Sequence, residues 1–118
     1  MEKLDERTYR FALQIVKLVA TLPRTPAGDV LGRQVLRSGT SVGANVEEAF
    51  GASTRREFSY KLTIALKEAK ETHYWLRLIK DACLVPADRI APLVQEALEI
   101  KLIIGKSIVT SKKQPASA

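Results

Sequence analysis

Few side chains in this chain are suited to catalysis. A di-metal carboxylate site in a helical protein needs a Glu-x-x-His pair, but His73 is the single histidine and Lys70 stands three residues before it. Four glutamates lie in the middle of the chain: Glu47, Glu48, Glu68 and Glu71. They could form a carboxylate cluster for acid–base chemistry. A polar network that holds helices in register explains them as well, and we expect no enzymatic activity.

The remaining reactive or cofactor-binding motifs are also absent. Cys83 is the only cysteine, so an intramolecular disulfide is impossible. Its apolar neighbours Leu84 and Val85 predict an inert, partly buried thiol. Gly39 and Gly43 lack the preceding strand and the lysine of a phosphate-binding loop, and their spacing instead favours close packing against another helix. We expect neither a cofactor nor a metal.

The charge balance favours an anionic partner. The chain has 118 residues and a formal net charge of +6, which suits one domain and makes nucleic acid the first candidate, with an acidic protein or a membrane surface behind it. Basic residues near the N-terminus recur at helical spacing and form a stripe. The candidate nucleic-acid contacts are Lys3, Arg7, Arg10, Lys17, Arg33 and Arg37.

Two of the elements that position these groups lie in the first half of the chain. Apolar residues at alternating four- and three-residue steps predict a helix over residues 4–22. A second helix should begin at Pro26, with Thr25 as its N-cap, and end at Gly51. Its repeated glycines oppose helix formation. We therefore expect tertiary packing with close backbone approach to stabilise it.

Two further helices are predicted in the second half. Thr54 and Glu57 form a capping box at the start of the third, whose apolar side extends to Ile79. Pro86 separates it from a fourth helix over residues 87–109. Long helices with short connections favour an all-α, antiparallel up-down-up-down four-helix bundle, with residues 1–110 as one domain and 111–118 as a disordered tail.

No segment resembles a signal peptide or approaches the length of a membrane span. The N-terminal residues are charged, and no apolar run reaches about 18 residues. We therefore expect a soluble cytoplasmic protein with no membrane partner.

Two residues suggest how the helices assemble. Asn45 occupies a position in the predicted apolar seam of the second helix, where one polar residue commonly fixes register or oligomeric state. Trp75, with Leu78, lies in a second stripe outside the tightest seam of the third helix, and Val94, Leu98 and Leu102 do the same in the fourth. Either the seam is wide within one chain, or the stripe is a subunit interface.

The polar stripes leave similar alternatives. Glu68 and Glu71 fall in the Trp75 stripe, so they and the basic stripe of the first helix could pair within one chain or between chains, or both could remain solvated. On another face of the second helix, four polar residues could form a polar interface or an anion-binding strip. They are Arg33, Arg37, Ser41 and Glu48.

The run Gln-Val-Leu-Arg-Ser-Gly-Thr-Ser-Val-Gly-Ala-Asn-Val-Glu-Glu-Ala at residues 34–49 resembles the signature of the 23S rRNA-intervening-sequence proteins. Phe58 and residues 61–78 continue the resemblance. It implies an antiparallel four-helix bundle assembled as a ring-shaped homopentamer. Some members are encoded within insertions in large-subunit ribosomal RNA genes. The resemblance implies no catalytic residues, and the matching positions are interpreted as fold and assembly residues: Arg37, Asn45, Glu48, Glu68 and Glu71.

A related branch of this family is the accessory variability determinant of diversity-generating retroelements. It is a basic pentameric barrel that binds a reverse transcriptase and nucleic acid. We therefore predict a non-enzymatic oligomeric scaffold that binds RNA, or an RNA–protein complex, through basic surface stripes. The alternative is a protein-interaction adaptor that docks a partner such as a reverse transcriptase, with nucleic-acid binding incidental.

Overall fold

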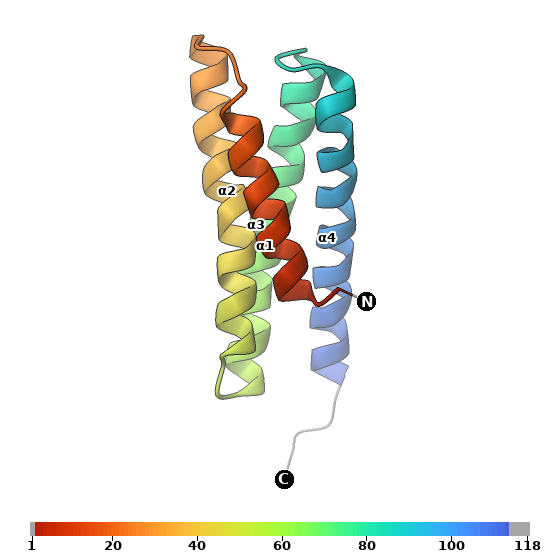
Figure 1. Ribbon diagram of the computed structural model, residues 1–118. Coiled ribbons are helices and arrows are strands. Elements are labelled where there is room, and N and C mark those ends of the chain that lie inside the picture. Colours follow the sequence, from red (N-terminus) through yellow and green to blue (C-terminus); the bar gives the residue numbers. More distant parts are fainter. Residues whose placement is uncertain (1, 114–118) are drawn as a thin grey trace.

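The computed structural model of the protein describes residues 2–113. They form four helices, α1 (Leu4–Val19), α2 (Pro26–Phe50), α3 (Arg55–Asp81) and α4 (Ala87–Lys113). Each helix runs antiparallel to the next, as the sequence predicts (Figure 1). Consecutive helices pack along their lengths, whereas α1 and α4 contact each other most sparsely. In the described range, no helix is long and apolar enough to cross a membrane.

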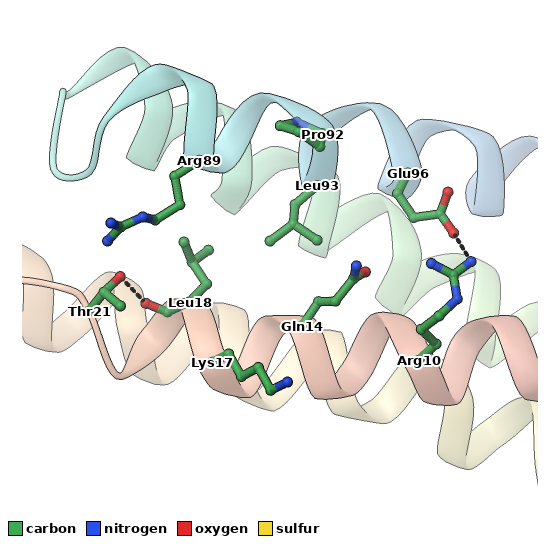
Figure 2. A pocket seen from close by; sticks show the side chains of 9 residues that line it. All are labelled: Arg10, Gln14, Lys17, Leu18, Thr21, Arg89, Pro92, Leu93 and Glu96. Carbon is green, nitrogen blue, oxygen red and sulfur yellow. Dashed lines mark hydrogen bonds and ion pairs between the residues drawn. The ribbon is translucent and has the colours of Figure 1, made fainter.

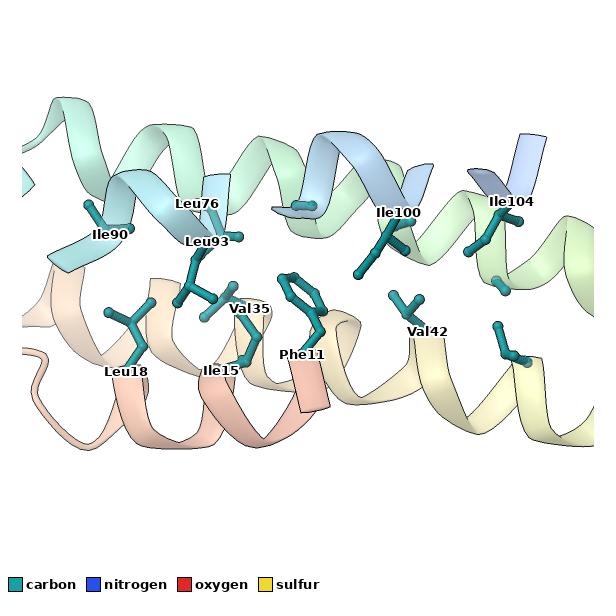
Figure 3. Packing of buried hydrophobic residues seen from close by; sticks show 14 of the residues in the cluster. Phe11, Ile15, Leu18, Val35, Val42, Leu76, Ile90, Leu93, Ile100 and Ile104 are labelled. Atoms are coloured by element: carbon teal, nitrogen blue, oxygen red, sulfur yellow. The ribbon is translucent and has the colours of Figure 1, made fainter. Parts of the chain in front are cut away.

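The core follows the predicted seams. Buried side chains from all four helices meet along the bundle axis (Figure 3). The largest fully buried apolar side chains are Phe11, Ile15, Leu62, Leu76, Ile79, Ile90, Ile100 and Ile104. Burying each such side chain contributes roughly 1.5–3 kcal/mol relative to exposure, so this core is the main source of stability.

The glycines of α2 allow α1 to approach closely, as predicted. A Cβ atom at Gly39 would lie 3.0 Å from Ile15 Cγ1, and one at Gly43 would lie 3.2 Å from the Thr8 carbonyl oxygen. A larger residue at either position would push α1 away from α2. The propensity cost of these glycines, up to about 1 kcal/mol each, is thus offset by helix–helix contact.

The capping residues lie where the sequence predicts them. The hydroxyl oxygen of Thr25 accepts a hydrogen bond from the Gly28 amide at 3.1 Å, and that of Thr54 accepts one from the Glu57 amide at 3.1 Å. These bonds satisfy amide groups that have no partner within the helix.

The first helix ends earlier than predicted. α1 stops at Val19 rather than Leu22, because the next residues form a tighter turn in which the Thr21 amide donates to the Leu18 carbonyl at 2.9 Å. The Thr21 hydroxyl donates to the same carbonyl at 2.7 Å. Leu22 is nevertheless buried, because the turn folds it over Gly32.

The fourth helix ends later than predicted, at Lys113. Ser111 is buried, and its Oγ lies 3.0 Å from the Oγ of Ser59 on α3. The predicted boundary at residue 110 is therefore corrected, and residues 111–113 belong to the bundle. The rest of the predicted tail, residues 114–118, lies outside the described residues.

The prediction of a partly buried thiol is wrong, because Cys83 is exposed. It follows α3 with a φ of 57°. Its amide donates to the Lys80 carbonyl at 3.0 Å, and the Leu84 amide donates to the Ile79 carbonyl at 3.2 Å. These two bonds form a Schellman motif, whose left-handed residue is usually glycine. The motif turns the side chain of Cys83 away from the core while Val85 is buried.

Candidate anion-binding surface

Arg7, a predicted nucleic-acid contact, joins α1 to α4. Its guanidinium donates to both carboxylate oxygens of Glu96, at 2.8 and 2.7 Å, and to Glu99 at 2.9 Å. The Arg7 and Glu96 side chains are 21% and 16% exposed. The hydrogen bonds to Glu96 raise the pKa of Arg7 well above its usual range. This guanidinium is therefore neutralised within the chain.

Arg10 is also paired. Its guanidinium donates to Glu2 at 2.8 and 3.1 Å and lies 3.6 Å from Glu96. The hydrogen bond raises the pKa of Arg10 and lowers that of the Glu2 carboxyl. The basic stripe of α1 therefore forms intrachain ion pairs over part of its length.

Arg37 holds the two predicted assembly glutamates of α3. Its guanidinium donates to Glu68 at 3.0 Å and also to Glu71. The hydrogen bond to Glu71 raises the pKa of Arg37. Glu48 pairs with Lys61 at 3.2 Å. These contacts connect α2 to α3, so the carboxylates stabilise the bundle through pairing within the chain.

Three predicted contacts remain without a carboxylate partner in the described part of the chain. Lys3 and Lys17 are exposed near opposite ends of α1, and Arg33 is exposed on α2. Lys17 lies on the same side of α1 as the paired Arg10, whereas Arg33 lies on another helix. The structure thus divides the six predicted contacts into three paired and three scattered cations.

Asn45 does not occupy the core. It is half-buried, and its Nδ2 donates to the Ser41 carbonyl of the same helix at 2.8 Å. Val46 is fully buried instead. The prediction of a core amide is therefore wrong within this chain.

Trp75 supports the wide-seam alternative in part. Its ring is half-buried, packs against the core cluster and meets Tyr74 edge-on, with ring centroids 5.0 Å apart. Val94 also packs against the core. In contrast, Leu78 and Leu102 are 39% and 61% exposed. The second stripe is thus internal at some positions and open at others.

A basic surface that sequence reasoning missed lies along α3 and α4. It consists of Lys70, Arg77, Lys101 and Lys106, and we call it the α3–α4 surface. Within residues 2–113, none of these four cations forms an ion pair with a carboxylate. His73 lies between them, with Nδ1 3.3 Å from Lys101 Nζ. Burial, followed by the charges of Lys101 and Arg77, lowers the pKa of His73 and so favours its uncharged form.

An apolar cleft runs through the α3–α4 surface. Its volume is about 540 Å³, and Lys70, Lys101 and Lys106 border it. Leu102 and Val109 line it and are 61% and 51% exposed. The seven-residue spacing of Lys70 and Arg77, which places both on one side of α3, was the signal available in the sequence.

A family model described as 23S rRNA-intervening sequence protein matches residues 3–106. The chain belongs to this family. Among solved structures, it is similar to a crystal structure from Bacteroides thetaiotaomicron of a protein with unknown function from the S23 ribosomal protein family. The two share 37% sequence identity and a TM-score of 0.83, over 90% of this chain and 98% of the other. A comparison with curated proteins found no match.

The described part of this 23S rRNA-intervening sequence protein presents charged and apolar surfaces suited to binding. Its glutamates are bound to arginines or lysines or are exposed, and residues 2–113 contain no group of three His, Cys, Asp or Glu side chains that could hold a metal. Four cations without carboxylate partners are suited to phosphate oxygens. The apolar cleft between them adds a surface suited to protein contact.

Proposed function

We propose that this 23S rRNA-intervening sequence protein is a non-enzymatic oligomeric scaffold that binds RNA, alone or in an RNA–protein complex. The observation that carries the proposal is the α3–α4 surface, where none of the four cations forms an ion pair with a carboxylate of residues 2–113. An accessible lysine or arginine without a carboxylate partner attracts phosphate more strongly than one already held in an ion pair. We therefore propose that RNA contacts this surface rather than the basic stripe of α1.

Phosphate contacts of this kind make affinity depend on salt more than on sequence. Four contacts to single-stranded RNA correspond to a slope of about −3 in the plot of log K against log salt concentration. A structured RNA should bind with a similar dependence and little base preference.

The test compares two triple variants with the same change in charge. One carries Lys70→Glu, Lys101→Glu and Lys106→Glu. The control carries glutamate at the three scattered cations Lys3, Lys17 and Arg33. Fluorescence anisotropy with a labelled structured RNA should show loss of binding in the first variant and retention in the control. Equal loss in both, or loss in the control alone, would refute this placement.

Self-assembly is part of the proposal. On the side of α1 that faces away from the core, Tyr9, Leu13 and Val16 are 66%, 46% and 47% exposed. A second copy that covers this stripe would remove apolar surface from water. The family resemblance favours a homopentamer, in which five chains of +6 would carry +30. Native mass spectrometry should find five copies, and a monomer would refute the assembly.

A second candidate function is that of a protein-interaction adaptor. The exposed Leu102 and Val109 favour it, because aliphatic side chains contribute little to phosphate binding but much to protein interfaces. The partner could be a reverse transcriptase, as in the related branch. Affinity capture from nuclease-treated host lysate separates the two functions. A protein retained without nucleic acid would support the adaptor.

A further inference from the structure

A second cleft lies between α1 and α4, on a different side of the bundle from the α3–α4 surface. Its volume is about 510 Å³. Gln14 and Leu18 from α1 and Arg89 and Leu93 from α4 point into the space between the two helices (Figure 2). This helix pair is the most sparsely packed of the neighbouring pairs. The cleft is thus open because α1 and α4 separate beyond the Arg7–Glu96 ion pair.

The floor and the rim of this cleft differ in chemistry. Leu18 and Leu93 are buried and make the floor apolar. Lys17 and Arg89 are exposed at the rim. Neither has a carboxylate partner among residues 2–113. Arg10 also borders the cleft but is held by Glu2 and Glu96, so two cations remain available to a ligand.

Gln14 supplies an independent observation. Its Oε1 is enclosed and has no hydrogen-bond donor in the described structure. Burying such an acceptor without a partner is unfavourable. An ionised carboxylate has no hydrogen to donate to this oxygen, so Gln14 marks an unfilled polar position in the wall and the choice of ligand rests on the floor and the rim. The cleft therefore contains a polar group whose hydrogen bonding is incomplete in the isolated chain.

We propose that the α1–α4 cleft binds a small organic anion with an apolar body, such as a medium-chain carboxylate. The volume falls within the range of about 300–1,000 Å³ typical of small-molecule sites. The apolar body would lie on Leu18 and Leu93, and the anionic group would meet the Arg89 guanidinium, whose donors match a carboxylate. RNA fits poorly, because the floor is apolar. The inference does not depend on the proposed RNA binding.

The first measurement uses anilinonaphthalene sulfonate, an aryl sulfonate whose fluorescence rises in apolar surroundings, with the full chain. We expect one saturable site per chain. Decanoate should displace the probe, whereas decanol, which has the same length of carbon chain but no charge, should displace it at least tenfold less well, because a charge-assisted hydrogen bond is lost.

Paired variants locate the site. Lys17→Ala with Arg89→Ala should raise the dissociation constant of decanoate about tenfold or more. Lys70→Ala with Lys106→Ala removes two cations from the α3–α4 surface and should leave the dissociation constant of decanoate unchanged. These four side chains lie at the surface, and circular dichroism checks that both variants remain folded. Absence of saturable binding, or equal weakening in both variants, would overturn the proposal.

Discussion

Replacing Arg7 with methionine isolates the ion pair that joins the first and last helices. Methionine keeps an apolar chain of similar length but removes every hydrogen bond to Glu96 and Glu99. Glu96, only 16% exposed, then keeps Arg10 as its remaining cation, at 3.6 Å. In the variant, the largely enclosed negative charge of Glu96 is therefore compensated only by the more distant Arg10.

The magnitude follows from the burial of this pair. Removing one partner of a fully buried pair costs about 3–5 kcal/mol, whereas an exposed pair contributes about 0–1 kcal/mol. Side-chain exposures of 21% for Arg7 and 16% for Glu96 place the pair between these limits. Because Arg10 compensates in part, we expect a loss of about 2 kcal/mol, equivalent to roughly 8 °C in melting temperature.

Urea unfolding followed by circular dichroism measures this loss. Lys61→Met is the matched control, because its partner Glu48 is 60% exposed and stays solvated when the lysine is removed, so its loss should cost less than about 1 kcal/mol. A double-mutant cycle of Arg7→Met with Glu96→Gln should give a coupling of about 1–2 kcal/mol. A cost for Arg7→Met no larger than that of the control, or no coupling with Glu96, would refute the reasoning.

Three further predictions test backbone and electrostatic features. Cys83→Gly should raise the free energy of unfolding by about 1 kcal/mol, because glycine adopts a positive φ without strain; an unchanged urea midpoint would contradict this. The pKa of His73 is lowered in the folded chain, so the unfolded chain binds this proton more readily and stability should fall as pH drops below 6.5. The fall should be smaller in His73→Gln. Identical pH profiles of stability for the two proteins would contradict the attribution of this fall to His73. In Gly28→Ala the new Cβ would lie 2.0 Å from the Pro23 carbonyl oxygen, so the free energy of unfolding should fall by at least about 2 kcal/mol. Gly105 has open space around it, so Gly105→Ala should raise the free energy of unfolding by up to about 1 kcal/mol. Thermal unfolding measures both, and the reverse order of stabilities would be inconsistent with the packing.

The helices and their buried sides could be predicted because helical periodicity depends on local spacing alone. The exact core positions were harder to predict. Because α2 packs against both α1 and α3, its buried side is wider than one seam, so Val46 is buried beside the half-buried Asn45 while Ala49 is buried as predicted. Ser111 was missed for another reason. Its burial depends on Ser59, which lies on another helix and which no local pattern connects to it.

The candidate surface was harder to predict than the fold. The basic stripe of α1 was visible, but its neutralisation depends on the rotation of α4, which brings Glu96 to Arg7. The α3–α4 surface combines cations from two helices, and only the packing shows that none of them forms an ion pair with a carboxylate of residues 2–113. Charge counted along one helix therefore identified candidate cations without showing which of them remain available.

The exposed thiol at the end of α3 offers a direct way to count subunits. Each chain carries one cysteine, and its side chain is exposed in the connection between α3 and α4. A maleimide dye would therefore label each copy once without altering the core. In single-molecule fluorescence, the number of photobleaching steps would then equal the number of chains in each particle.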